Sequence, residues 1–282
     1  MQNISEFFGL SCLDLSQDFA SALKRQLCPF TKKICIKVRK SNPKTKIGTC
    51  TVNYQNKDII ICPFRLLEHN QIFIDCLHLL TCHEPGNTLY IVPEVQIPGG
   101  NVDYFLVSAQ NNKVRDFLGI ELQTMDTTGT VWPTRQLFLN GIGIPVPKKD
   151  LTNPKAFGMN WKMTLKTILV QMHHKSRTFE HLNKHLVLIV QTPLFQHMLQ
   201  DFDFNSIVGV RTGDPIHIHS YLLNSFDNHF SLSLDTRIST DSTGMARCLG
   251  LNAEPEVDLQ VLIQTLERKI NEGNRLTIGL TQ

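Results

Sequence analysis

The chain lacks the features that mark membrane and secreted proteins. None of its apolar runs is long enough to cross a bilayer. Residues 1–16 carry acids early and have no basic segment followed by an apolar core, so they do not resemble a signal peptide. We therefore expect a cytoplasmic protein with no membrane partner, in which the eight cysteines are thiols or metal ligands rather than disulfides.

Internal repeats, low-complexity segments and a glycine-rich phosphate loop are also missing. The remaining composition is ordinary for a globular protein, with 41% hydrophobic and 19% charged residues in a chain of 282. This length allows one large domain or two modest ones with a sizeable core. Because helical and strand patterns mix throughout, we expect an α/β (α+β) fold.

Acidic residues are absent from residues 19–57, although the whole chain has a net charge of only +3. This segment holds ten basic residues: Lys24, Arg25, Lys32, Lys33, Lys37, Arg39, Lys40, Lys44, Lys46 and Lys57. A basic segment without acids suits a polyphosphate partner, since each Lys or Arg at a phosphate releases a counterion. The pattern therefore favours contact with nucleic acid, and the alternative is an ordinary solvated basic face.

Four cysteines lie in or just after this basic segment: Cys28, Cys35, Cys50 and Cys62. Two of them precede Pro-Phe, and one follows Gly-Thr, so they are placed on predicted turns. Thiolates on tight turns suit a tetrahedral Cys₄ metal site, and sulfur ligation fits either zinc or iron. The alternative is four buried free cysteines, which is what we expect of the other four.

The periodicity of apolar residues predicts the order of helices and strands. We expect helices over residues 1–27, 64–82, 158–183, 193–202 and 255–272, and strands over residues 88–95, 102–109, 116–122, 185–191, 216–223 and 230–238. Residues 124–136 are polar and irregular, which predicts a loop able to contact a substrate.

Residues 101–123 read as two strands joined by a polar turn. Asp103 begins the first strand, and Glu121 and Gln123 project from one face of the second. Two carboxylates converging at a sheet edge can hold Mg²⁺, which prefers oxygen ligands, and Glu94 could add a further acid. The alternative is a hairpin that exposes its charges to water.

Two motifs together resemble a known family. The segments GGNVDYFLV and GIELQTMDTTGTVWPTRQ, preceded by the four cysteines in order, resemble NotI-type restriction endonucleases over residues 24–140. That family is a branch of the PD-(D/E)xK nucleases with an N-terminal Cys₄ metal element. The resemblance implies a mixed central sheet flanked by helices, with the Cys₄ element within residues 1–82 and the nuclease core within residues 83–282. No motif places residues 150–282.

The resemblance also implies roles for individual residues. Asp103 and Glu121 correspond to the two metal-binding acids, with the carbonyl of Leu122 as a further ligand of Mg²⁺. Most of the superfamily has lysine at the position of Gln123, whereas the NotI-type branch has glutamine there, as this chain does. Glu94 resembles an extra upstream acid of that branch. Cys28, Cys35, Cys50 and Cys62 correspond to ligands of a structural iron, which zinc could replace.

The implied activity is type II restriction: Mg²⁺-dependent cleavage of double-stranded DNA at a GC-rich palindrome. A homodimer and a companion DNA methyltransferase in a prokaryotic cytoplasm follow from it. Arg135 and Asp126 are the candidate base readers, since Arg reads guanine and Asp accepts from cytosine; the alternatives are a phosphate contact for Arg135 and a turn cap for Asp126. Lys37, Arg39 and Lys40 of the basic segment are expected to contact DNA phosphates. The competing hypothesis is a DNA-binding regulator without enzymatic activity, which leaves Asp103 and Glu121 without a role.

Overall fold

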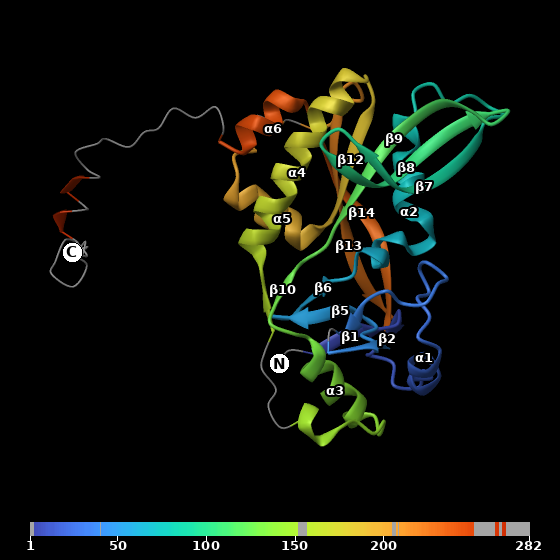
Figure 1. Ribbon diagram of the computed structural model, residues 1–282, viewed down its shortest axis with the longest axis vertical. Helices are drawn as coiled ribbons and strands as arrows, with labels where there is room; N and C mark the ends of the chain where they lie inside the picture. Colours follow the sequence, from blue (N-terminus) through green and yellow to red (C-terminus); the bar gives the residue numbers. More distant parts are fainter. Residues whose placement is uncertain are drawn as a thin grey trace, which may run out of the picture.

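A six-stranded mixed sheet forms the centre of the protein (Figure 1). The computed structural model describes residues 3–39, 41–151, 157–204, 207, 209–250, 263–264 and 267–268. The central sheet has the strand order β14-β13-β12-β9-β8-β7. The strands are β7 (Thr88–Ile97), β8 (Gly100–Gln110), β9 (Lys113–Gln123), β12 (His185–Gln191), β13 (Ile216–Phe226) and β14 (His229–Thr240).

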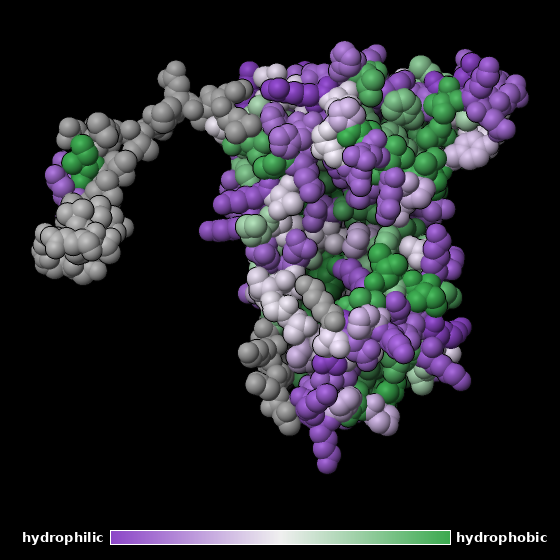
Figure 2. Space-filling model, viewed as in Figure 1, coloured by the Kyte–Doolittle hydropathy of each residue, from purple (hydrophilic) through white to green (hydrophobic). Residues whose placement is uncertain are grey.

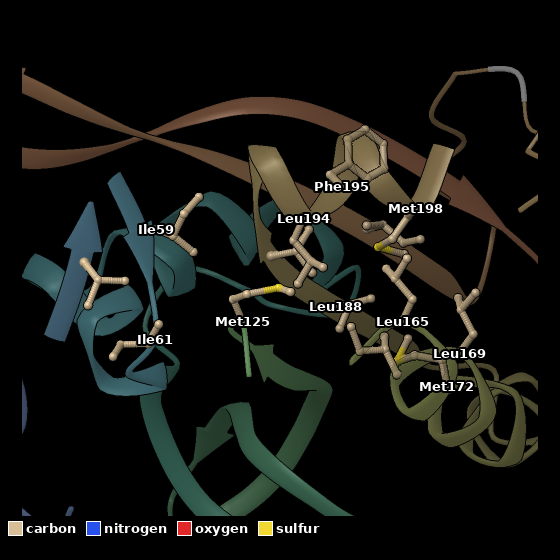
Figure 3. Close-up of a cluster of buried hydrophobic side chains, with 14 of the residues drawn as sticks. Ile59, Ile61, Met125, Leu165, Leu169, Met172, Leu188, Leu194, Phe195 and Met198 are labelled. Carbon is tan, nitrogen blue, oxygen red and sulfur yellow. The ribbon is translucent and has the colours of Figure 1, made fainter. Parts of the chain in front are cut away.

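The three middle strands, β9, β12 and β13, run parallel, and the outer pairs are antiparallel. Parallel neighbours need crossover connections, which are supplied by helix α4 (Trp161–His181) and helix α5 (Thr192–Asp201). The apolar stripes of both helices pack on β12 and β13 in the larger core (Figure 3). The short helix α6 (Ser242–Cys248) lies beside α4 on the same face. The mixed sheet flanked by helices therefore agrees with the fold class expected from the sequence.

The other face of the sheet is covered by a broken helical segment. It consists of the 3₁₀ helix η1 (Pro63–Asn70), helix α2 (Gln71–Cys76) and the 3₁₀ turn η2 (Leu77–Leu79). The expected continuous helix over residues 64–82 is therefore wrong. The chain leaves helical geometry at Glu68 (ψ 124°) and takes a left-handed φ of 51° at His69. These pieces still bury their apolar side chains against β9 and β12 in a second core.

The N-terminal region is a four-stranded sheet of order β2-β1-β5-β6 rather than the helix expected over residues 1–27. Its strands are β1 (Asn3–Phe7), β2 (Leu10–Ser11), β5 (Thr49–Tyr54) and β6 (Lys57–Ile60). A tight turn through Phe8 (φ 48°) and Gly9 (φ 76°) joins β1 to β2, and only α1 (Phe19–Arg25) is helical. The apolar residues at helical spacing are therefore divided between two strands and one short helix.

Small elements complete the described structure: β3 (Val38–Arg39) pairs with β4 (Asn42–Lys46), and β10 (Thr127–Thr128) pairs with β11 (Gly158–Met159). The loop expected over residues 124–136 ends early, because helix α3 (Trp132–Gly141) begins within it; the 3₁₀ turn η3 (Lys148–Asp150) follows. The helix expected over residues 255–272 lies outside the described residues, apart from four positions.

Two buried contacts join the N-terminal sheet to the central sheet. Arg65 Nε lies 2.8 Å from Glu6 Oε2, and its NH2 donates to the carbonyl of Phe230 on β14 at 3.2 Å. The Gln191 side chain accepts from the Ile60 N–H at 2.8 Å and donates to the Asp58 carbonyl at 2.7 Å. Both contacts join residues on the two sides of the domain boundary that the sequence predicts between residues 82 and 83. The division into two domains stays a prediction.

Hydrophilic side chains dominate the face shown in Figure 2, and apolar areas interrupt them over the arm formed by β7, β8 and β9. Four consecutive residues of the edge strand β7 contribute exposed apolar surface: Leu89, Tyr90, Ile91 and Val92. In the part of the chain described here, no helix is both long and apolar enough to cross a membrane.

Candidate active site

Three acidic residues fall in one row across three neighbouring strands. Tyr104 pairs with Ile120 between β8 and β9, so the antiparallel register places Asp103 opposite Glu121. On the other side, Pro93 pairs with Tyr104 and Val95 with Val102, which places Glu94 opposite Asp103. Acids expected from the sequence to act together are therefore brought together by strand register.

The faces of β9 agree with the prediction from its alternation. Ile120 and Leu122 are buried in the second core, beneath α2. Glu121 and Gln123 point to the opposite face and line a cavity of about 330 Å³ with Asp103 and residues of α4. Asp103, Glu121 and Gln123 therefore line one cavity, and their catalytic roles stay a prediction.

Asp103 lies where the hydrogen-bonded pairing of β8 and β9 ends, and a backbone N–H of β9 holds its carboxylate. The pairing stops at Tyr104 and Ile120, and the free N–H of Leu122 donates to Asp103 Oδ2 at 2.8 Å. Burial raises the pKa of Asp103, which this hydrogen bond and the nearby charge of Lys175 oppose. No described residue donates a hydrogen bond to Asp103 Oδ1, which leaves that oxygen for a ligand.

Lys175 on α4 is a site residue that the sequence does not place beside the carboxylates; from the sequence it is expected only as a phosphate contact or as part of the solvated face of the helix. Its Nζ lies 2.7 Å from Glu121 Oε1, and it also donates to the carbonyl of Asn101 on β8. Burial raises the pKa of Glu121 to about 7, while the hydrogen bond from Lys175 lowers it. One signal was available, because Lys175 falls at an apolar position of the helix, between Met172 and Phe179.

The β7–β8 turn fixes the distance between the sheet and α4. Gly99 has a φ of +100°, and a Cβ atom there would lie 2.9 Å from the carbonyl oxygen of His174. Thr178 Oγ1 donates to the carbonyl of Pro98 at 2.9 Å, which ties the same turn to the helix. A glycine is needed at residue 99 because the turn requires both a left-handed conformation and close contact with the helix backbone.

Glu94 is placed differently from the other acids. It is exposed, has a left-handed φ of 52° within β7, and lines a second cavity instead of the one that Asp103 and Glu121 line. Its charge still contributes to the raised pKa of Asp103, after the larger effect of burial. The structure therefore brings Glu94 close to the pair without bringing it into their cavity.

The second cavity gathers the four cysteines predicted to bind metal. Cys28, Cys35, Cys50 and Cys62 all line this space of about 450 Å³, next to Lys37 and Tyr104. Cys28 and Cys35 flank a tight turn in which the Cys28 N–H donates to the Lys33 carbonyl at 2.7 Å. The N–H of Cys62 donates to the carbonyl of Cys50 at 3.2 Å, which brings the second pair together.

The chemistry of these donors suits a thiophilic metal. All eight cysteines are free thiols, and three of the four at the cavity are buried. Burial raises the pKa of Cys50 and of Cys62, and charge on neighbouring thiols adds to both shifts. Among the described residues, no three Cys, His, Asp or Glu side chains are grouped so that they could hold a metal ion as they stand. The donor set fits iron or zinc in kind, and the metal site remains a prediction.

Several of the residues expected to contact DNA have side chains that are already engaged by other parts of the protein. Arg135 is only 2% exposed; its Nε donates to the Ile47 carbonyl at 2.7 Å, and its guanidinium lies 4.6 Å from the Trp132 ring centroid. We correct its expected role as a guanine reader, because these interior contacts occupy the guanidinium. The Arg39 guanidinium lies 4.2 Å from the Trp132 ring centroid and pairs with Asp150 at 3.2 Å.

The remaining candidates differ in position. Lys37 donates to the Ile61 carbonyl beside the cysteines, so it faces the cysteine-lined cavity. Asp126 is exposed, and its backbone N–H donates to Thr164 Oγ1 at the start of α4 at 3.3 Å. Lys40 lies outside the described residues.

Comparison with known proteins gives no family for this chain. No family model matches the sequence, and no curated protein matches it either.

Proposed function

We propose that the protein is a Mg²⁺-dependent, site-specific DNA endonuclease of the PD-(D/E)xK type. The observation that carries this proposal is that Asp103 and Glu121, on adjacent strands, line one cavity with Gln123 between the sheet and α4. A fold with a mixed sheet flanked by helices is compatible with that nuclease class. The family resemblance of residues 24–140 supplies the reaction type.

Each residue at the cavity would have its own role in the reaction. Asp103, Glu121 and the Leu122 carbonyl would hold Mg²⁺, which when bound supplies a more acidic water and neutralises charge at the scissile phosphate. The Leu122 N–H holds Asp103 through Oδ2, which would leave Oδ1 for the metal. Gln123 can orient the attacking water through its amide but carries no positive charge.

The exposed face of α4 supports a polyanionic substrate. Lys162, Lys166 and Arg177 are exposed on this helix, which forms one wall of the cavity. Cations along the rim of the site would contact phosphates flanking the cleaved bond. Double-stranded DNA with a GC-rich palindrome, a homodimer, a companion methyltransferase and a prokaryotic cytoplasm complete the proposal through the resemblance.

The cysteine cavity would hold a structural iron or zinc. Three of its four thiols are buried next to the N-terminal sheet, so a bound metal would stabilise this region of the fold. The same cavity and the basic segment around it also favour the second candidate, a DNA-binding regulator without nuclease activity.

A cleavage assay separates the two candidates. Purified protein is incubated with several unrelated plasmids in Mg²⁺, with an EDTA control; discrete fragments are expected, and D103N and E121Q should lose about 10²-fold or more of the cleavage rate while still binding DNA in Ca²⁺. The matched control is D227N, which changes an exposed acid in the β13–β14 turn. Intact but retarded DNA with wild-type protein would favour the regulator.

A further inference from the structure

Lys175 is a buried lysine with an unusual set of partners. The residue is only 4% exposed, and its ammonium contacts Glu121 on β9 and the Asn101 carbonyl on β8. Lysine is rarely buried to this extent unless it is paired. Here the ammonium lines the same cavity as Asp103 and Gln123, so it belongs to the wall of the candidate active site.

A second lysine shows what a purely structural ion pair looks like in this sheet. Lys184 Nζ lies 2.6 Å from Asp116 Oδ1, and Asp116 also accepts from the N–H groups of Cys82 and Phe117. That carboxylate is saturated by partners, and neither residue lines one of the cavities described above. The Lys175–Glu121 pair has the same chemistry but opens onto a ligand-sized space.

The hydrogen-bond count of Lys175 leaves one donor available. An ammonium group has three N–H donors and no acceptor. Two of them are used, by Glu121 and by the Asn101 carbonyl, and no acceptor for the third is found among the described residues. Because the ammonium lines the cavity, the third donor can reach a ligand bound there.

The local backbone makes room for this arrangement. Lys175 occupies an apolar position on α4, which turns its side chain toward the sheet instead of toward solvent. Gly100 has a φ of +126°, and a Cβ atom there would lie 3.4 Å from Lys175 Cε. The β7–β8 turn and the helix therefore both guide the ammonium to the space between Asn101 and Glu121.

We propose that Lys175 is the cationic group of this active site: it holds Glu121 in position and donates its third N–H to the scissile phosphate. This inference rests on the proposed nuclease function and deepens it. Gln123 leaves the site without a positive charge from β9, and Lys175 supplies that charge from α4. Gln123 on β9 and Lys175 on α4 would together do the work of the single lysine that most of the superfamily has at the position of Gln123.

The test compares four variants under single-turnover conditions with saturating Mg²⁺. K175M removes the charge, and K175Q keeps a hydrogen-bond donor without it, in case K175M does not fold. The double variant K175M/Q123K returns a charge to the same face of the site from β9, and K184M is the matched control. Melting temperature and DNA affinity in Ca²⁺ are measured for each, because neither depends on cleavage.

If the proposal is correct, K175M and K175Q cleave about 10²-fold more slowly than wild type, while DNA affinity in Ca²⁺ changes less than about threefold, as expected for an interaction made mainly in the transition state. K175M/Q123K regains at least about tenfold of the lost rate, and K184M cleaves like wild type.

Two results would overturn the role of Lys175 alone: a folded K175M or K175Q that cleaves within about threefold of wild type, or a loss of rate that follows DNA affinity and that Q123K does not restore. Wild-type protein that fails to cleave DNA would overturn the proposed function, and this proposal with it.

Discussion

His217 and His219 are enclosed on β13, and the charge of Asp214, which favours the charged form of His217, is outweighed by burial. Both have no exposed surface, and Nδ1 of His217 and Nε2 of His219 have no hydrogen-bond partner among the described residues. Burial lowers the pKa of His217 to about 4 and that of His219 to about 3, and Arg237 adds to the shift at His219. Cys76 lies 3.7 Å from His219 Nδ1 and provides only a weak partner.

These shifts predict a loss of stability in mild acid. Below pH 6.5 the unfolded chain binds protons at both histidines, and the folded protein does so only near pH 4 and pH 3, so the stabilisation is complete above pH 6.5 and is lost as the pH falls. At pH 5 the expected cost is about 2 kcal/mol for each histidine. Urea unfolding at pH 7 and pH 5 measures it.

A substitution assigns this pH dependence to the buried histidines. H219Q should reduce the difference in unfolding free energy between pH 7 and pH 5 by about 2 kcal/mol, whatever its effect at pH 7. H229Q, which changes an exposed histidine at the start of β14, should leave that difference unchanged. An unaltered pH dependence in H219Q would show that other groups cause it.

At the scale of elements, the β7–β8 turn should control both stability and activity. G99A places a Cβ 2.9 Å from the His174 carbonyl in a left-handed conformation (φ +100°), so it combines backbone strain with a clash. Gly86 has a similar φ of +93° and nothing within 4 Å of the corresponding Cβ, which makes G86A the matched control for strain alone.

We expect G86A to lose about 1 kcal/mol of unfolding free energy and G99A to lose about 2–3 kcal/mol. Because Asn101 and Asp103 follow this turn on β8, G99A should also lower the cleavage rate, whereas G86A should not. Denaturant titration and the plasmid assay give the two readouts. Equal stability of the two variants would mean that the turn can move away from α4 without cost.

The central elements could be predicted from the sequence because their signals are local. Alternating apolar residues define β8 and β9, and the same alternation places Glu121 and Gln123 on one face. The N-terminal helix was wrong because leucines at helical spacing are equally compatible with a hairpin once Phe8 and Gly9 take left-handed conformations. Side-chain partners set by tertiary contacts, such as Lys175 with Glu121 and Arg135 with Ile47, carry no local signal strong enough to identify them.

At the scale of the whole molecule, the cysteine cavity and the carboxylate cavity lie on opposite faces of one strand. On β8, Tyr104 lines the cysteine cavity and the adjacent residue, Asp103, lines the carboxylate cavity. Burial raises the pKa of Tyr104, and the charges of Asp103 and Cys28 add to the shift, so this tyrosine lies within electrostatic reach of both sites. The N-terminal element therefore supports the strand that carries the candidate catalytic acid.

If the carboxylate cavity is the nuclease site that we propose, its use has a consequence for double-strand cleavage. A single site cuts one strand at a time, whereas a palindrome presents the same bond twice, related by a two-fold axis. We therefore expect two chains to act together on one DNA site, and sedimentation of the protein with its DNA should show a dimer. A monomer in both the free and the DNA-bound state would contradict this expectation.

Mixing experiments give the decisive readout for a dimer. If two chains act together, wild-type protein should convert supercoiled plasmid directly to linear DNA, because both active sites of the dimer would cut during one binding event. When wild type and an excess of D103N are allowed to exchange subunits, most active dimers contain one functional site, and nicked circles should become the main product. D103N alone should give neither product. If wild-type protein alone instead gives nicked circles that become linear only later, each chain acts independently and the dimer is not the cutting unit.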